Sequence, residues 1–321
     1  MVTLLYSHPA CLEHDTGPHH VERPDRVRAV LAALEAASFD ALDRREAPLA
    51  DLADVERAHP KAFVDAVLDA MPDQGLVALD PDTVVSPGSK EAALRAVGAV
   101  CAAVDAVVAG EAANGFCAVR PPGHHAEPTR PMGFCVFNSV AIAALRARQV
   151  HGLDRVAVVD FDVHHGNGTQ RMFETDGHLF YASTHQFPLY PGTGAAEETG
   201  VGNIVNAPLA PGTGPDGFRA AMERQILPAL RRFAPDLLLI SAGFDAHRAD
   251  PLAGLRLETE DFGWATDALC AVAGEYCGGR VVSILEGGYE LGALADSAAC
   301  HVERLMAAGA GRTAIRRESH G

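Results

Sequence analysis

Residues 156–168 read Val-Ala-Val-Val-Asp-Phe-Asp-Val-His-His-Gly-Asn-Gly, an apolar run that passes directly into a cluster of carboxylates and imidazoles. A short run rich in β-branched residues is typical of a strand buried in a parallel sheet. In an extended chain, side chains two residues apart point to the same side, so Asp160, Asp162 and His164 can enter one pocket. The stretch therefore predicts a strand over 156–163 that delivers metal-ligand chemistry at its carboxyl end.

Similar apolar runs, ending in Gly, Asp, Ser or His, occur at 179–184, 237–244 and 281–286. Between them, Ala, Leu and Arg recur at helical spacing, at 25–37, 90–109, 139–148, 216–233 and 260–276. This alternation predicts a single α/β domain over 1–321, with a mostly parallel sheet and helices on both faces. Long Gly- and Pro-rich stretches are expected to be functional loops, at 120–133, 185–202 and 207–217.

Composition excludes several classes of protein. The 321 residues are 48% hydrophobic and 21% charged, as in an ordinary globular protein, and the net charge of −16 disfavours direct binding of nucleic acid. No apolar run is long enough to span a membrane, and Met1–Ser7 lacks the pattern of a secretory signal, so we expect a cytoplasmic protein. Seven cysteines without CxxC spacing predict free thiols in a reducing compartment. The sequence contains no signal for an oligomeric state.

The end of a second strand can bring a further ligand to the same pocket. The run that starts at Leu237 continues into Ser-Ala-Gly-Phe-Asp245, and parallel sheets bind ligands beyond the carboxyl ends of neighbouring strands. Asp162, His164 and Asp245 would form a set of one imidazole and two carboxylates, which leaves the open position that catalytic zinc requires. Iron(II) or cobalt would fit the same ligands. The alternative is that these carboxylates cap turns and helix N-termini.

Two further segments carry chemistry beside such a site. Arg-Pro-Pro-Gly-His-His-Ala-Glu (120–127) places His124 and His125 on a rigid loop, where one can act as general base and the pair can pass a proton to a leaving amine. Glu-Gly-Gly-Tyr (286–289) follows a predicted strand, and its phenol can stabilise an oxyanion. The alternatives are a surface loop with solvated histidines and a simple turn covered by Tyr289.

The four motifs together, in this order, resemble those of the histone deacetylase and acetylpolyamine amidohydrolase superfamily. The resemblance runs from about Pro18 to Tyr289, and the His-His-Gly-Asn-Gly and Glu-Gly-Gly-Tyr segments are similar to the class II branch, in a bacterial-type member. It implies the arginase/deacetylase fold, in which one large parallel sheet is flanked by helices. It also implies one Zn²⁺ per chain and a structural K⁺.

The resemblance also implies a role for each matching residue. The zinc ligands would be Asp162, His164 and Asp245. His125 would be the general base and acid, His124 its electrostatic partner, and Tyr289 the group that binds the carbonyl and then the oxyanion. Asp160 would accept a hydrogen bond from His124. Asn167 stands where some relatives have Asp behind the second His. An amide there can still orient the ring, but it stabilises a protonated ring less than a carboxylate does. The protonation state of His125 before the reaction is therefore left open.

Further residues match the parts of the family that hold potassium and substrate. Potassium would be bound by Ser183, the carbonyl of Thr184, and the main-chain oxygens of Asp160, Asp162 and His164. Phe134, after Gly133, and Tyr190 resemble the aromatic walls of the acyl-lysine tunnel. Arg26 resembles the Arg that lines the acetate exit channel, and Asp82 a rim residue that holds the substrate backbone.

The expected function is zinc-dependent, water-mediated hydrolysis of the amide of acetyl-lysine or a related N-acyl amine. An acetylpolyamine or another small amide is the alternative substrate, although Leu252 stands where polyamine-selective relatives place an acidic residue, and an apolar side chain gives an ammonium no partner. A two-metal ureohydrolase would need a second Asp where this chain has His247. An inactive acyl-lysine-binding module should have lost a ligand, a catalytic His or the Tyr, and all are present.

Overall fold

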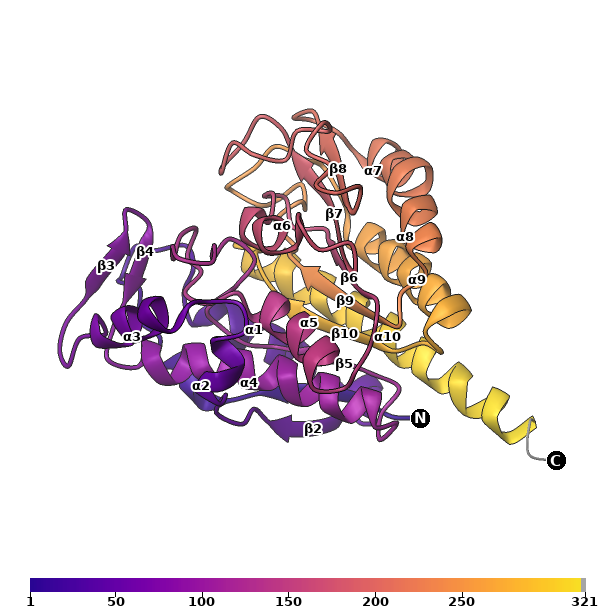
Figure 1. Cartoon of the computed structure of the whole chain (residues 1–321), viewed down its shortest axis with the longest axis horizontal. Helices are drawn as coiled ribbons and strands as arrows, with labels where there is room; N and C mark the ends of the chain where they lie inside the picture. Colours follow the sequence, from indigo (N-terminus) through magenta and orange to yellow (C-terminus); the bar gives the residue numbers. More distant parts are fainter. Residues whose placement is uncertain (319–321) are drawn as a thin grey trace.

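An eight-stranded sheet, in which every neighbouring pair is parallel, forms the centre of the computed structural model, which describes residues 1–318 (Figure 1). In spatial order the strands are β2 (Asp43–Glu46), β1 (Thr3–Ser7), β5 (Asn114–Cys117), β10 (Val281–Leu285), β9 (Leu237–Ala242), β6 (Val156–Asp160), β7 (Leu179–Gln186) and β8 (Ile204–Leu209). The strand nearest the C-terminus therefore lies in the middle of the sheet, between β5 and β9. The predicted α/β class with a parallel sheet is confirmed.

The side chains of β6 alternate between two hydrophobic cores, one on each face of the sheet. Ala157 and Val159 belong to the core formed with α1 (Asp25–Ala33), α8 (Leu227–Phe233), α9 (Thr259–Tyr276) and α10 (Leu291–Glu318). Val156 and Val158 belong to the core formed with α4 (Ser89–Val108) and α5 (Ser139–Gln149). Because both faces of the strand are buried, its sequence is continuously apolar rather than alternating. Helices on both faces are confirmed (Figure 1).

The strand that begins at Val156 ends three residues earlier than predicted. The carboxylate of Asp160 accepts the N–H of Asp162 at 3.1 Å, and that of Asp162 accepts the N–H of His164 at 2.8 Å. Such local bonds from Asp side chains to the backbone compete with the ladder of a sheet. The chain therefore bends after Asp160 instead of staying extended.

The other helices and the loops also differ slightly from the predicted bounds. The segment predicted as one helix over 216–233 comprises α7 (Pro215–Ala221), a π-helical turn (Met222–Ile226) and α8. Short helical segments complete the chain: Pro9–Leu12, Ala37–Phe39, α2 (Leu52–Val55), α3 (Lys61–Asp69) and α6 (Asn167–Phe173). Two predicted loops were too long, because β7 extends to Gln186 and pairs with β8 as far as Leu209. Among the described residues, no helix combines the length and apolar character that a bilayer span requires.

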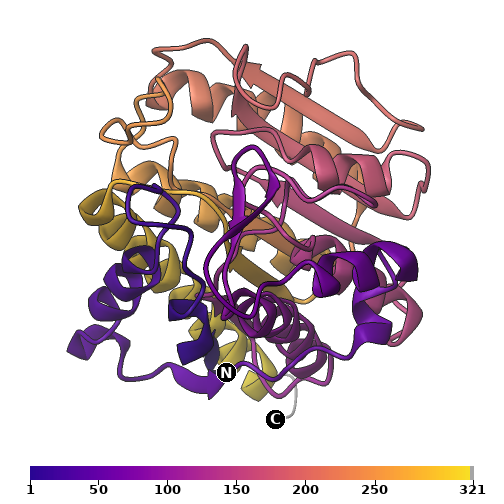
Figure 2. The same ribbon diagram turned by 90° about the vertical axis from the view of Figure 1, so that its left-hand side faces the viewer.

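A separate antiparallel hairpin stands beside the main sheet. It consists of β3 (Val77–Asp80) and β4 (Thr83–Val85), and it packs through Val85 on a third, smaller core with α2, α3 and α4. Figure 2 views the molecule from the side on which the hairpin projects. The hairpin brings Asp82 next to the loops that follow the strands.

Candidate active site

Three predicted ligands meet where the chain leaves β6 and β9. Ligand atoms of Asp162, His164 and Asp245 all lie within 4.8 Å of one another, and the three side chains are buried. Nδ1 of His164 lies 3.1 Å from Oδ1 of Asp162 and 3.1 Å from Oδ2 of Asp245. A single ring nitrogen that faces two carboxylate oxygens in this way suits a shared cation.

The electrostatics of this cluster also fit a bound cation. Burial, together with the charge of Asp162, raises the pKa of Asp245 to about 7. A divalent cation between the two carboxylates would favour the ionised form of both. Two carboxylates and one imidazole without thiolate match zinc, and three protein ligands leave one position open.

Two glycines allow the backbone to approach the carboxylates closely. A Cβ atom on Gly243 would lie 2.0 Å from Oδ2 of Asp162, and one on Gly287 would lie 2.1 Å from Oδ2 of Asp245. The N–H of Gly287 also donates to Oδ2 of Asp162 at 2.8 Å. A side chain at position 243 would therefore displace the carboxylate of Asp162, and one at position 287 would displace that of Asp245.

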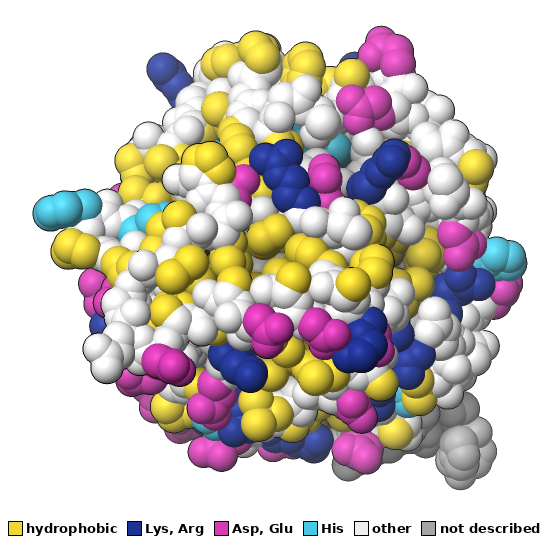
Figure 3. Space-filling model, turned by 60° about the vertical axis from the view of Figure 1, so that its left-hand side comes forward, with side chains coloured by type: hydrophobic (Ala, Val, Ile, Leu, Met, Phe, Trp, Pro, Cys, Tyr) yellow, Lys and Arg dark blue, Asp and Glu magenta, His cyan; other side chains and the backbone are white. Residues whose placement is uncertain are grey.

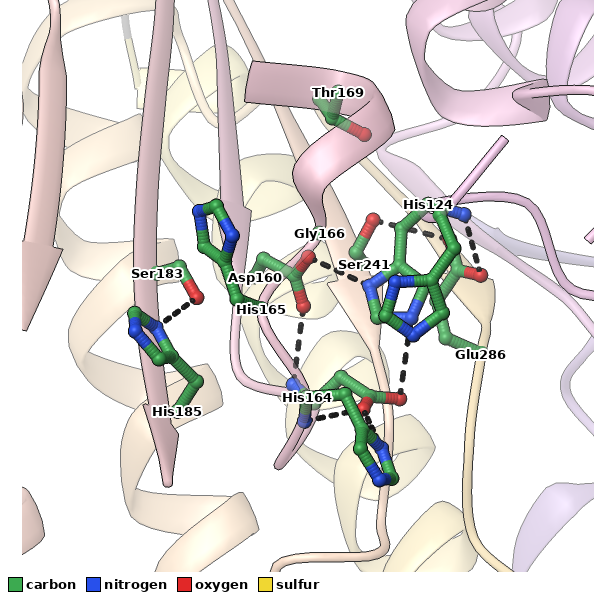
Figure 4. Close-up of polar contacts among 12 residues, drawn as sticks. His124, Asp160, His164, His165, Gly166, Thr169, Ser183, His185, Ser241 and Glu286 are labelled. Carbon is green, nitrogen blue, oxygen red and sulfur yellow. Dashed lines mark hydrogen bonds and ion pairs between the residues drawn. The ribbon is translucent and has the colours of Figure 1, made fainter. Parts of the chain in front are cut away.

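The His pair lies beside this cluster, and His124 lies between Asp160 and Glu286 (Figure 4). Nδ1 of His124 is 2.9 Å from Oδ2 of Asp160, and its main-chain N–H donates to Oε2 of Glu286 at 3.2 Å. Burial would lower the pKa of His124, but the carboxylates of Asp160, Asp162 and Glu286 raise it to about 10. His124 is therefore an imidazolium at neutral pH.

His125 has the opposite electrostatic environment. Its ring centroid lies 4.0 Å from that of His124, and its Nδ1 lies 2.9 Å from Oδ1 of Asn167. Burial, and then the charges of His124 and His164, lower the pKa of His125 well below its usual value. The pair thus combines one charged and one neutral imidazole, the pattern expected for separate acid and base roles.

Tyr289 approaches the pocket from the loop after β10. Arg26 holds this loop from beneath, because its Nε donates to the carbonyl of Gly288 at 2.6 Å and its Nη2 to that of Glu286. The guanidinium carbon of Arg26 lies 4.8 Å from the centroid of the Tyr289 ring. Burial raises the pKa of Tyr289 well above its usual range, so the phenol keeps its proton and can donate it in a hydrogen bond.

A pocket of about 260 Å³ opens onto these residues. Its lining contains His125, His164 and Tyr289. It also contains five of the six substrate-binding residues predicted from the sequence: Asp82, Gly133, Phe134, Tyr190 and Leu252. One further lining residue, Leu189, was not predicted. Arg26 lies behind Tyr289 and does not line the pocket. The structure thus brings together the predicted metal, histidine and tunnel residues.

The walls of the pocket are held by hydrogen bonds from the hairpin. Oδ1 of Asp82 accepts the N–H of Gly133 at 3.1 Å, and Oγ1 of Thr83 accepts the N–H of Phe134 at 3.2 Å. Phe134 has a φ of 68°, in the left-handed region that non-glycine residues rarely adopt. These two bonds fix that conformation and the position of the ring. Burial and the neighbouring carboxylate of Asp80 raise the pKa of Asp82.

Of the residues predicted to hold potassium, Asp160 ends β6, Ser183 and Thr184 lie on β7, and Asp162 and His164 lie in the turn that follows β6. Asp160 is paired with Ser183 in the register of the two strands. Oγ of Ser183 lies 2.9 Å from Nδ1 of His185 (Figure 4), and the buried Oγ1 of Thr184 has no hydrogen-bond partner among the described residues.

Two residues that support the site, Glu286 and Asp250, were not predicted to do so. Oε1 of Glu286 accepts the hydroxyl of Ser241 at 3.1 Å, and its Oε2 accepts the N–H of Gly123 at 2.7 Å. Asp250 accepts the N–H of Tyr289 at 2.7 Å. The position of Glu286 at the end of a buried strand was a usable signal. No pattern in the sequence indicates the contact of Asp250 with Tyr289 or the place of Leu189 in the lining of the pocket.

Acidic and basic side chains are mixed on the face that carries the hairpin, and neither forms a continuous charged patch there (Figure 3). Apolar side chains extend across it, with acidic and basic side chains interspersed (Figure 3). All seven cysteines are free, as expected, and five of them are buried.

Comparison with known proteins assigns the family. Residues 20–305 match the histone deacetylase domain. "Histone deacetylase 10, chloroplastic" of Oryza sativa subsp. japonica is 41% identical over 92% of this chain and 71% of that protein, and the "Histone deacetylase-like amidohydrolase" of Pseudomonas aeruginosa is 39% identical over 89% and 81%. The crystal structure of the HDA15 HD domain superposes with a TM-score of 0.90 at 35% identity, over 96% of this chain and 90% of that one. The chain therefore belongs to the histone deacetylase family and is a hydrolase of that family's type.

Proposed function

We propose that the protein is a zinc-dependent deacylase that hydrolyses the amide of acetyl-lysine or of a related N-acyl amine. The observation that carries this proposal is the buried cluster of Asp162, His164 and Asp245 beside a pocket that is also lined by His125 and Tyr289. Zinc held by these three residues would act as a Lewis acid that polarises the substrate carbonyl and lowers the pKa of water.

The two histidines have complementary tasks in this proposal. His125 is neutral and faces the pocket, so it can take the proton of the attacking water. His124 is charged and 4.0 Å away, ring centre to ring centre, and it stabilises negative charge that develops during attack. Protonated His125 then passes its proton to the leaving amine. Asp160 supports the charge on His124 throughout.

Tyr289 stabilises the oxyanion in this proposal. Its phenol is a hydrogen-bond donor at neutral pH, and the loop that carries it is held by Arg26 and Asp250. A donor whose position is fixed before the reaction stabilises developing charge without reorganisation.

The walls of the pocket favour acyl-lysine over an acylated polyamine. Phe134 and Tyr190 are aromatic walls that suit the four-carbon stem of lysine. Leu252 offers no charge to an ammonium group, whereas a polyamine retains at least one such group after one amine is acylated. Asp82, at the rim, can accept an N–H from the backbone of a peptide substrate.

A panel of substrates, with and without metal, tests this function. We expect turnover of an acetyl-lysine peptide at a higher kcat/KM than acetylated putrescine or spermidine, and loss of turnover after chelation that one equivalent of zinc restores. A clear preference for the polyamines would reverse the assignment of substrate. Two equivalents of metal per chain would contradict the mononuclear site, and binding of the peptide without any turnover would indicate a binding module.

Two further expectations remain proposals. Potassium at Asp160, Asp162, His164, Ser183 and Thr184 rests on the resemblance to the family, and it predicts a melting temperature that is higher in potassium chloride than in an equal concentration of tetramethylammonium chloride. A cytoplasmic location agrees with the seven free cysteines.

A further inference from the structure

A second polar chain runs away from the pocket behind His125. Nδ1 of His125 lies 2.9 Å from Oδ1 of Asn167, and Nδ2 of Asn167 donates to Oε1 of Glu127 at 2.9 Å. Asn167 is buried at the first turn of α6, whereas Glu127 is half-buried on the loop that carries the His pair. The three side chains thus connect the proposed base to a carboxylate that does not line the pocket.

We propose that Glu127 is a positioning residue, which fixes the orientation of the Asn167 amide and thereby determines which nitrogen of His125 is free to accept a proton. This inference rests on the proposed role of His125 as general base. Glu127 would act through Asn167 and would touch neither substrate nor metal.

The argument follows from the donors and acceptors of the three groups. An ionised carboxylate only accepts hydrogen bonds, so Glu127 requires the nitrogen of the amide to face it. The amide oxygen then faces His125 and, because it only accepts, requires a proton on Nδ1. Neutral His125 has one ring proton, so Nε2 keeps its lone pair.

The reverse orientation of the amide would disable the base. An N–H group that faced Nδ1 would require a lone pair there, which moves the ring proton to Nε2. On the nitrogen side of Asn167, the other neighbour is Sδ of Met132 at 3.4 Å, a weak acceptor. Of these two neighbours, only Glu127 therefore distinguishes strongly between the two orientations.

The backbone around Glu127 is held without its side chain. Its N–H donates to the carbonyl of Arg130 at 2.9 Å, and Asn138 donates to the carbonyl of Ala126 at 3.1 Å. A substitution at position 127 should therefore leave the course of the His loop unchanged, and its effect should pass through Asn167.

Steady-state kinetics of the full-length, zinc-loaded protein test the first step. Glu127→Leu should lower kcat about ten- to a hundredfold, by analogy with the loss of a group that orients a metal-ligating histidine, with KM and zinc content unchanged. Glu127→Gln should lose less, because its amide oxygen can still accept from Asn167. Glu46→Gln, an exposed position on the edge strand β2, removes the same charge far from the site and should leave kcat unchanged. An unchanged kcat in Glu127→Leu would overturn the proposal.

The same substitution in an Asn167→Asp variant tests whether Glu127 positions Asn167 or only supports the fold. The variant Asn167→Asp presents an acceptor to His125 in either orientation, and its carboxylate is repelled by Glu127. In Asn167→Asp, the further change Glu127→Leu should therefore not lower kcat. Equal losses from Glu127→Leu in the parent and in Asn167→Asp would show that Glu127 only maintains the fold, and would also overturn the proposal.

Nitrogen NMR of the His125 ring gives a measurement that does not depend on turnover. With ¹⁵N-labelled histidine and His125→Gln to assign the signals, the parent protein should show a protonated Nδ1 and an unprotonated Nε2. Glu127→Leu should shift the ring toward the other tautomer, and an unchanged Nδ1–H tautomer there would refute the proposal. If the parent shows the expected tautomer but hydrolyses no acylated substrate, the proposed function fails while the role of Glu127 stands.

Discussion

At the scale of single residues, Tyr289 allows its hydroxyl to be tested separately from its ring. The ring packs over Arg26 and lies edge-to-face with Phe134, 5.9 Å between centroids. Phenylalanine would keep both contacts and lose the donor. We expect Tyr289→Phe to retain its melting temperature and zinc content, and to lose on the order of a hundred- to a thousandfold in kcat, as for other oxyanion donors. Turnover close to that of the parent would remove Tyr289 from the mechanism.

The residues that carry the chemistry were easier to predict than those that support them. Asp162, His164 and Asp245 stand just after apolar strands, so their proximity follows from the rule that parallel strands present their carboxyl ends at one edge. Asp250 acts by accepting a main-chain N–H from a loop 39 positions further along the chain. A main-chain N–H is the same for nearly every residue, so the sequence contains no sign of such a partner.

At the scale of the elements, Asn138 joins the start of α5 to the His loop. Its Oδ1 caps the helix by accepting the N–H of Ala141 at 3.0 Å, while its Nδ2 donates to the carbonyls of His124 and Ala126. We expect Asn138→Ala to lose about 1 kcal/mol of stability from the cap, with a further loss from the unsatisfied carbonyls. It should also lower kcat, because the His pair loses a support.

A cap remote from the site provides the matched control for Asn138. Asp261 closes the capping box of α9 by accepting the N–H of Glu258 at 2.9 Å. Asp261→Ala breaks this bond and the ion pair of Asp261 with Arg219, so it should lower the free energy of unfolding by about 1 kcal/mol or more and leave kcat unchanged. Urea denaturation and steady-state kinetics on both variants check the pair. Equal effects on kcat would show that general destabilisation, and not the His loop, accounts for the loss in Asn138→Ala.

Neither edge strand of the sheet was predicted from the sequence. The edge strand β2 reads Asp-Arg-Arg-Glu, and only alternate residues are half-buried, so it lacks the apolar run that identified the central strands. The strand β8 (Ile204–Leu209) lies between and across two stretches rich in Gly and Pro, and its second half, residues 207–209, falls inside the predicted loop at 207–217. Sequence patterns therefore predicted the four adjacent strands β10, β9, β6 and β7, and neither edge of the sheet.

At the scale of the whole molecule, buried histidines make stability sensitive to acid. Burial lowers the pKa of His14 and His59 to about 4 and that of His301 to about 3. In the unfolded chain these imidazoles bind protons below about pH 6.5, whereas in the folded protein they stay neutral. Their contribution to the free energy of unfolding is therefore complete above about pH 6.5 and is lost as the pH falls towards 4. Glu286 acts in the opposite sense, because its pKa is raised to about 7.

One variant isolates the contribution of a single histidine to this acid sensitivity. His301 is fully buried between the hydroxyls of Thr266 and Ser283, far along the chain from the metal ligands. We expect the free energy of unfolding of the zinc-loaded parent to fall more steeply between pH 6.5 and 4 than that of His301→Gln, by about one proton in slope. Urea titrations at pH 7, 6 and 5 measure this difference. Parallel curves for the two proteins would contradict it.

The central place of β10 constrains the order in which the chain can assemble during synthesis. While a ribosome still holds residues beyond about 280, β5 and β9 face each other across an open gap, each with an unpaired edge. The strands on either side of this gap can pair with their other neighbours. The loop that bears Tyr289 cannot take its place, because it follows β10. Nascent chains should therefore be inactive and prone to aggregate through these strand edges until they are released. A chaperone that covers exposed strand edges should raise the yield of active protein.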